Sequence, residues 1–192
     1  VERGLSDFAR SQLPFALSLA LNDTAADVKR NVEKGLARRL DRPTRFTMNA
    51  FALRRSSKRR LQASVFAKDR QAAYLIFQER GGERSPKGRA IVVPVRLRTN
   101  RFGNMARGAV KKALAKPAVF SGRPKGGGRP GGIYERLPKG RGLRLLVDYA
   151  DRASYSPRLD FRRGAERTAK VRMPHHFERA LNRAIATARR GP

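Results

Sequence analysis

The chain has 192 residues, of which 45 are Lys or Arg and 15 are Asp or Glu, so its formal net charge is +30. Hydrophobic residues make up 40% of the chain, which is enough for a packed core and excludes a fully disordered protein. Cysteine is absent, which excludes disulfides and thiolate metal sites and agrees with synthesis in a reducing compartment.

The first 43 residues predict an arm followed by a long helix. Residues 1–14 form the expected N-terminal arm of a single domain over residues 1–192. Apolar residues then recur three or four positions apart, on one helix face: Leu21, Ala25, Val28, Val32, Leu36 and Leu40. A helix is therefore predicted over about 21–40, capped within the Asn-Asp-Thr string or running unbroken from about Pro14. Pro43 ends it, because proline disfavours a helical residue before it.

Short strands are predicted next. Residues 46–53 form a helical turn or begin a strand, residues 61–68 alternate as a strand does, and residues 72–78 form a strand or a short helix. Residues 90–95 are rich in β-branched residues, and Pro94 makes them an edge strand or an extended segment. Four phenylalanines in these segments are expected in the core: Phe46, Phe51, Phe66 and Phe77.

The second half predicts a helix, a loop, a hairpin and more helix. Residues 104–116 have moderate helical character, and residues 121–132 form a flexible basic loop that is rich in glycine. Residues 133–137 and 143–149 read as two strands joined by a Pro-Lys-Gly turn. Two C-terminal helices follow, the first near 158–171 and the second after a proline, with one apolar stripe: Phe177, Leu181, Ile185 and Ala188.

This order favours the α+β class, with a long N-terminal helix and a C-terminal helix packed on a small, mostly antiparallel sheet. The longest apolar runs, Phe15–Leu21 and Ala90–Val95, are far shorter than the roughly 20 residues that span a bilayer, so no membrane partner is expected. The opening Val-Glu-Arg lacks the pattern of a signal peptide, and none is expected.

No catalytic constellation is recognisable, so we expect no enzyme, no metal and no cofactor. His175 and His176 point about 100° apart on a helix and cannot chelate one metal by themselves, so a surface or interface role at a helix start is predicted. Asp148 and Asp151 lie near a strand end rather than on a helix, and Asp148 is expected to neutralise a nearby Arg. The glycines of 126–131 fit Gly-x-Gly-x-x-Gly, but Pro130 interrupts the motif and no helix follows, which favours a loop.

The charge predicts an anionic partner, because a compact chain with this much like charge repels itself. Charge alone offers three candidates, in the order nucleic acid, an acidic neighbouring subunit and a membrane surface, and of these no membrane partner is expected. Basic clusters bind phosphate through charge and counterion release, and no pattern for sequence-specific readout is present. We expect these residues to face partners: Arg54, Arg55, Lys58, Arg59, Arg60, Arg123, Lys125 and Arg129. Further clusters occur at Arg96/Arg98/Arg101, Lys111-Lys112 and Arg162-Arg163.

Four strings resemble a known family when taken together. They are Ala20-Leu-Asn-Asp-Thr-Ala-Ala-Asp-Val, then Asp41-Arg-Pro-Thr with Phe46-Thr-Met-Asn-Ala, then Arg101-Phe-Gly-Asn-Met-Ala-Arg-Gly, and finally Phe177-Glu-Arg-Ala-Leu-Asn-Arg-Ala-Ile-Ala-Thr-Ala-Arg. In this order, over roughly 15–190, they resemble the minor tail protein Z-like, tail-completion family of tailed bacteriophages. The chain departs from that family in its short, glycine-rich middle, where a longer basic insert is expected.

The resemblance implies a structural virion protein at the head–tail junction, made in the host cytoplasm. It implies a homo-oligomeric ring, six-fold in symmetry, whose neighbours are the tail terminator, the connector and the tail tube, with contact to the DNA backbone as a further possibility. The alternative is a ribosomal-type or nucleoid protein that binds RNA or DNA backbone without sequence preference. A nuclease is the weakest alternative, because its metal would need clustered acids.

Overall fold

A computed structural model of the chain describes residues 10, 12–125 and 128–188. Most of the predicted arm, residues 1–9 and 11, lies outside the described residues. The chain divides into two compact units, where the sequence indicated one domain. Unit 1 combines residues 1–79 with residues 158–192, and unit 2 comprises residues 80–157.

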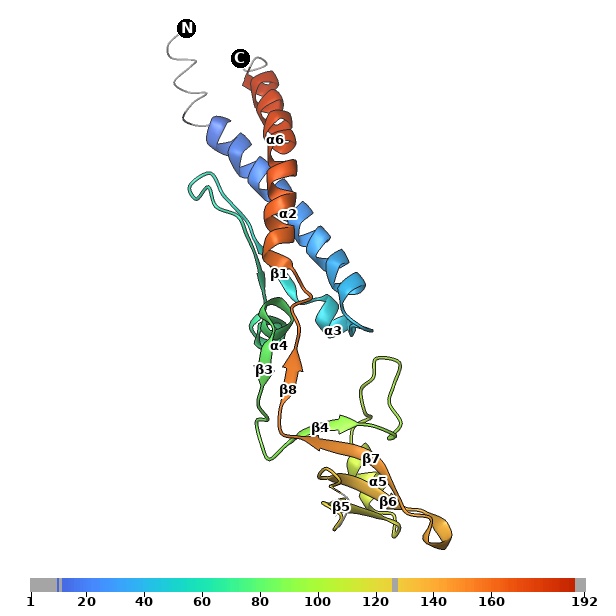
Figure 1. Cartoon of the computed structure of the whole chain (residues 1–192). Helices are drawn as coiled ribbons and strands as arrows, with labels where there is room; N and C mark the ends of the chain where they lie inside the picture. The colour runs from blue at the N-terminus through green and yellow to red at the C-terminus, as the bar shows by residue number, and fades with distance from the viewer. Residues whose placement is uncertain (1–9, 11, 126–127, 189–192) are drawn as a thin grey trace. The chain divides into compact units, whose positions relative to one another are not determined.

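Unit 1 is built on two long antiparallel helices, α2 (Leu13–Arg39) and α6 (Phe161–Ala188), which lie side by side (Figure 1). Side-chain contacts follow the pair along its length: Arg39 meets Asp160 at 3.2 Å, Asn31 meets Thr168 at 2.7 Å, and Asp23 meets Arg179 at 2.7 Å. The α2 helix thus begins near Pro14, as one of the two predicted alternatives has it.

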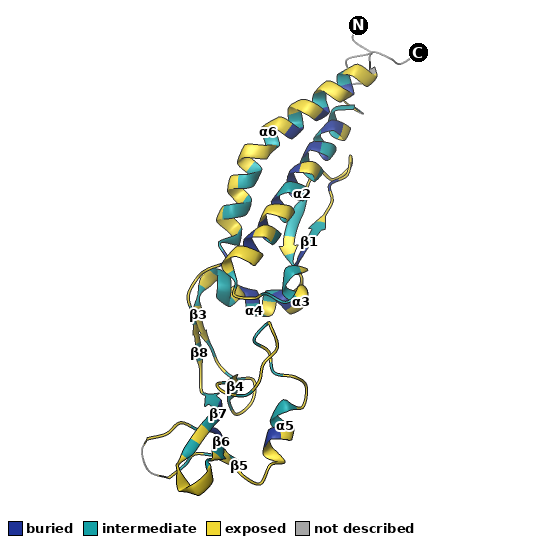
Figure 2. Ribbon diagram, turned by 90° about the vertical axis from the view of Figure 1, so that its right-hand side faces the viewer, coloured by how far each residue is buried: buried dark blue, intermediate teal, exposed yellow. Residues whose placement is uncertain are grey.

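The core of unit 1 lies where α2 meets the short elements that follow it. These are α3 (Arg45–Met48), β1 (Phe51–Arg54), β2 (Ser64–Ala67) and α4 (Asp69–Arg80). Strands β1 and β2 pair antiparallel, with Phe51 opposite Ala67. The core residues are Val28, Val32, Leu36, Ala50, Phe51, Leu75 and Leu159, and Figure 2 shows the dark blue buried face that runs along α2. Ala25 is buried too, so the predicted apolar stripe of the first helix is confirmed at its four central positions.

Helix α6 corrects the prediction of two C-terminal helices, because Pro174 lies inside one continuous helix. A proline within a helix removes one hydrogen bond and costs about 3 kcal/mol. Contacts with α2 on both sides of the proline, from Thr168 to Ala184, offset this cost. The buried stripe also differs from the predicted one. Its members are His176, Ala180 and Ala184, while Phe177 is only half-buried.

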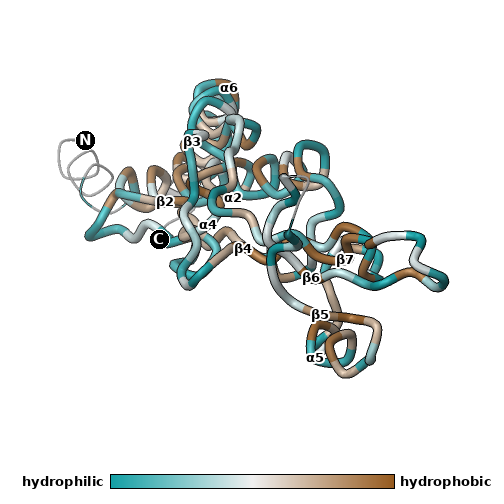
Figure 3. Tube along the Cα trace, turned by 60° about the horizontal axis from the view of Figure 1, so that its bottom comes forward, coloured by the Kyte–Doolittle hydropathy of each residue, from teal (hydrophilic) through white to brown (hydrophobic). Residues whose placement is uncertain are grey.

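Unit 2 holds two antiparallel sheets and one short helix. Its elements are β3 (Gly82–Arg84), β4 (Ile91–Pro94), α5 (Ala109–Leu114), β5 (Val119–Gly122), β6 (Gly132–Arg136), η2 (Pro138–Gly140), β7 (Leu143–Ala150) and β8 (Ala153–Tyr155). The larger sheet has the order β4-β7-β6-β5, and β3 pairs with β8. Ile133 and Val147 are fully buried between α5 and this sheet, whose strand β7 is largely brown in Figure 3.

Several strand predictions are confirmed. The β6–β7 hairpin turns at Pro138-Lys139-Gly140, and β4 with Pro94 is an edge strand. Residues 72–78 belong to a helix, α4, rather than to a strand. Two of the phenylalanines expected in the core, Phe46 and Phe66, are exposed. The α+β class is confirmed, and among the described helices none is both long and apolar enough to cross a bilayer.

Candidate functional site

Five of the predicted partner-facing residues lie on one β-hairpin, which we call the basic hairpin (residues 54–60). It extends the β1–β2 pair and closes through a bridge between Ser57 and Arg60, whose backbone N–H and C=O groups bond reciprocally at 2.9 and 3.1 Å. Lys58 and Arg59 therefore form its tip. All five predicted cations of the basic hairpin are exposed: Arg54, Arg55, Lys58, Arg59 and Arg60.

A clamp from α2 fixes the position of the basic hairpin. The Asn22 side chain accepts a hydrogen bond from the backbone N–H of Ser56 at 2.7 Å and donates one to its carbonyl at 3.1 Å. Ser56 is buried, and its hydroxyl donates to the Arg60 carbonyl at 3.0 Å. The Lys58 ammonium lies 5.0 Å from the ring centre of Phe15, a cation–π contact. The hairpin thus presents its cations from a fixed base.

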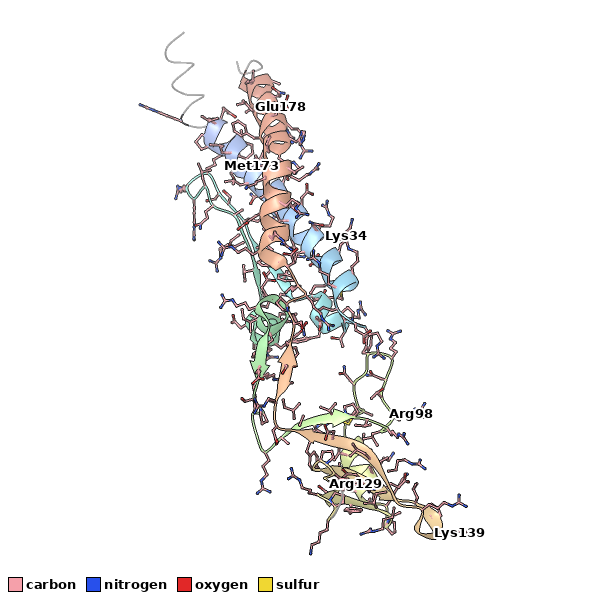
Figure 4. The ribbon with its side chains drawn as sticks, viewed as in Figure 1. Lys34, Arg98, Arg129, Lys139, Met173 and Glu178 are labelled. Carbon is pink, nitrogen blue, oxygen red and sulfur yellow. The ribbon has the colours of Figure 1, made fainter. Side chains whose placement is uncertain are left out.

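The other three predicted residues, Arg123, Lys125 and Arg129, lie in the loop between β5 and β6, in unit 2. All three are exposed, and Figure 4 labels Arg129. Residues 126–127 of the predicted glycine-rich loop lie outside the described residues. The loop ends in a fixed base, because the Tyr134 hydroxyl donates to the Pro130 carbonyl at 2.8 Å. The two predicted groups of cations therefore belong to different units.

Many of the described acids form ion pairs with cations outside the two predicted groups. Ion pairs join Asp23 to Arg179, Asp27 to Arg172, Glu83 to Arg152, Glu135 to Arg144, Asp160 to Arg39 and Glu166 to Arg162. Within the described part of the chain, none of the eight predicted partner-facing cations forms an ion pair. Unit 2 has 19 Lys and Arg against four Asp and Glu, a net charge of +15, which leaves +15 for unit 1.

A surface or interface role at a helix start is predicted for His175 and His176, and the helix start is wrong because both lie inside α6. His175 is exposed, and His176 lies buried in the α2–α6 seam. Its Nε2 lies 2.8 Å from Oδ2 of Asp27, and its Nδ1 lies 3.0 Å from the Arg179 guanidinium. Arginine can only donate, so Nδ1 accepts and the ring proton on Nε2 is donated to Asp27. Within the described ranges, no group of three His, Cys, Asp or Glu residues could hold a metal ion.

Asp27 is the electrostatic centre of this seam. Its Oδ2 accepts from Arg172 Nε at 2.7 Å and its Oδ1 from Arg30 at 2.8 Å. Hydrogen bonds from Arg172 and then from His176 lower the pKa of Asp27 from 3.8 to about 2. The expectation that Asp148 neutralises a nearby arginine is wrong. Asp148 forms an ion pair with no arginine in the described residues, and its buried Oδ1 has no hydrogen-bond partner there.

The lowered pKa of Asp27 predicts a pH-dependent stability. Because the folded-state pKa lies below the unfolded value of 3.8, the stabilisation is complete above pH 4 and is lost as the pH falls through about 2. We expect Asp27→Asn to lower the free energy of unfolding by about 1–2 kcal/mol at neutral pH and by less than half of that near pH 2.5. Urea unfolding of both proteins at the two pH values measures this, and an equal loss at both would contradict it.

Asn22 is the positioning residue that the sequence did not indicate. The sequence offers Asn22 as a possible helix cap. The helix begins nine residues earlier, so the Asn22 side chain is free to bond Ser56. The Asn22-Asp23-Thr24 string in the middle of a helical pattern is the signal that could have pointed to such a contact, because asparagine disfavours helix interiors.

Comparisons with protein-family models, with curated proteins and with solved structures found no match. The function is therefore inferred from the residues and their geometry.

Proposed function

We propose that this protein is a structural component of a tailed-phage virion, which completes the tail or neck and joins it to the filled head. It assembles as a six-fold ring around the DNA channel, without catalysis, beside tail terminator, connector and tail-tube proteins. One observation carries the proposal: the basic hairpin is held rigidly on α2, and no acid of the described residues neutralises it.

Ring assembly explains why such a surface is tolerated. Identical subunits in a ring make heterologous contacts that close on themselves. An uncompensated basic face destabilises a free subunit by self-repulsion, and an acidic ring above or below, or DNA in the channel, removes that repulsion. The proposal therefore assigns the basic hairpin to a contact between rings or with DNA.

Two of the four strings behind the family resemblance lie at junctions between elements, whereas the first lies within α2 and the last within α6. Asp41-Arg42-Pro43-Thr44 follows the end of α2, and the Thr44 hydroxyl caps α3 by accepting from the Thr47 N–H at 3.2 Å. Arg101–Gly108 leads into α5, and the last string lies in α6.

A protein of ribosomal or nucleoid type is the rival. The even division of charge, +15 in each unit, favours it as much as it favours a virion protein, because a polyanion can neutralise both units. The two functions differ in one respect: a ring protein assembles without nucleic acid, and the rival needs nucleic acid to form large species.

Charge reversal tests the assignment of the two basic loops. A phage that lacks this gene is complemented with Arg55→Glu/Lys58→Glu/Arg59→Glu or with Arg123→Glu/Lys125→Glu/Arg129→Glu. Each reversal sets carboxylates against the acidic ring or DNA that the loop is proposed to contact, so we expect infectious particles to fall about 100-fold. Electron microscopy should show filled heads separated from tails.

The matched control reverses three exposed cations of unit 1 that lie outside the basic hairpin: Lys34, Arg167 and Arg183. It should leave the titre within a few-fold of the wild type, because these residues lie on the helix pair. Normal assembly and DNA delivery with either loop reversed would contradict the assignment of that loop.

A further inference from the structure

Unit 2 contains an open pocket of about 650 Å³ beside α5 that is separate from both predicted basic loops. Two stretches line it, residues 97–101 and residues 106–116. Its more buried lining is apolar and comprises Leu97, Ala109 and Ala113. The volume lies within the range of about 300–1,000 Å³ that is typical of ligand sites.

The exposed lining of this pocket is cationic. Five cations contribute to it: Arg98, Arg101, Arg107, Lys112 and Lys116. The lining includes no acid, and none of the five forms an ion pair with any described residue. Five like charges around one recess repel each other, so an anion that enters it is stabilised by all of them.

The framework of the pocket is well ordered by hydrogen bonds. The Asn100 side chain accepts from the N–H groups of Phe102 and Asn104 at 2.9 and 3.1 Å, and the Asn100 N–H donates to the Asn104 carbonyl at 2.8 Å. The Arg101 guanidinium lies 4.7 Å from the ring centre of Phe102. The Leu97 N–H donates to the Leu146 carbonyl of β7, which attaches the loop to the sheet. Arg98 and Arg101 are thus carried on a loop that hydrogen bonds close and attach to the sheet.

We infer that this pocket binds the phosphodiester backbone of a nucleic acid strand, without sequence preference. Each guanidinium group can bind two phosphate oxygens at once, and Lys112 of α5 and Lys116 just after it act as point charges beside them. The apolar lining gives the sugar faces between the phosphates a surface to lie against. This inference rests on the proposed function only for the source of DNA, the channel of the virion.

Two features favour a nucleic acid over an acidic protein as the occupant. A phosphodiester strand has one charge per nucleotide, so it neutralises several cations in one recess whatever its sequence. Protein interfaces have aromatic or large apolar anchors at their centre. This pocket has no aromatic residue among its lining, and its apolar part consists of one leucine and small alanines.

The experiment measures binding of a fluorescent duplex of about 20 base pairs, and of an oligothymidine of equal length, to the full chain over a salt series. The variant Arg98→Gln/Arg107→Gln/Lys112→Gln changes only exposed side chains. We expect binding of at least one of the two DNAs to weaken about 10- to 100-fold, with a salt slope lower by about 2 to 3, because up to three phosphate contacts are lost. The control, Lys87→Gln/Arg89→Gln/Arg141→Gln, removes the same charge from exposed positions of unit 2 outside the pocket and should weaken binding less than about threefold.

Equal weakening by both variants would overturn the inference, since only net charge would then matter. Polyglutamate that binds more tightly than either DNA, and loses binding with the pocket variant alone, would overturn it in favour of an acidic protein. The oligomeric state of the same variants, measured by mass photometry, tests the proposed function separately from this inference. Pocket-dependent DNA binding by a protein that forms no ring would leave this inference standing and the proposed function without support.

Discussion

Replacing Gly132 with alanine is expected to destabilise unit 2 by about 3 kcal/mol, the upper end of the cost of overpacking a core. Gly132 begins β6 and is buried against β7. A Cβ at this position would overlap the carbonyl oxygen of Val147 and come within 2.8 Å of Leu145 Cδ1. The paired strands would have to separate, which disturbs the sheet that forms the base of the β5–β6 loop.

The adjacent glycine provides the control. A Cβ on Gly131 would lie 3.8 Å from Tyr149, an ordinary contact, so Gly131→Ala should change the stability by less than about 1 kcal/mol. Native-state hydrogen exchange measures both variants. Amides of β6 and β7 should lose protection in Gly132→Ala, whereas amides of α2 should keep it. Wild-type protection of β6 in Gly132→Ala would contradict the close approach of the two strands.

Replacing Asn22 with alanine is expected to lower the free energy of unfolding of unit 1 by about 2–3 kcal/mol. The change leaves both the N–H and the carbonyl of Ser56, a buried residue, without the hydrogen bonds of the clamp, and each lost partner costs about 1–3 kcal/mol. The Ser18 hydroxyl, 3.4 Å from the same carbonyl, retains part of the contact. Urea unfolding monitored by circular dichroism gives the change.

Two further variants identify the clamp as the cause. Asn182→Ala changes an exposed asparagine of α6 and should cost less than about 0.5 kcal/mol. Asn22→Asp keeps the acceptor for the Ser56 N–H and loses the donor to its carbonyl, so its stability should fall between wild type and Asn22→Ala. Equal losses in Asn22→Ala and Asn182→Ala would show that the hairpin does not depend on this residue.

The sequence predicts those parts of the fold that follow from local chemistry. The repeat through Val28, Val32 and Leu36 specifies the buried face of α2, and the Pro138-Lys139-Gly140 turn specifies the β6–β7 hairpin. Pro94 cannot donate a hydrogen bond within a sheet, which limits β4 to an edge. In each case a few neighbouring residues decide the outcome.

Other features depend on contacts that are distant in the sequence. Ala16 and Ala20 extend α2 towards its N-terminus because they pack on Ala180 and Ala184, and small residues give only a weak periodic signal. The same helix pairing keeps Pro174 inside α6. It also joins residues 1–79 to residues 158–192, so the chain divides into units that no local composition change marks.

The candidate sites also include features that follow from local sequence and features that depend on distant contacts. Exposure of the cations at 54–60 and 123–129 follows from composition, because Lys and Arg are rarely buried unless paired. The Asn22 clamp and the unit 2 pocket could not be predicted. The first joins residues 34 positions apart, and the second brings residues 97–101 together with α5.

The central claim is that this chain assembles into a ring by its own contacts. Mass photometry or native mass spectrometry of the nuclease-treated protein, across a salt series, tests it most directly. The account predicts a discrete species of ring size, six subunits, that persists at high salt without nucleic acid. A monomer that becomes large only when nucleic acid is added, and dissociates as the salt rises, would contradict it and identify a nucleic-acid-binding protein instead.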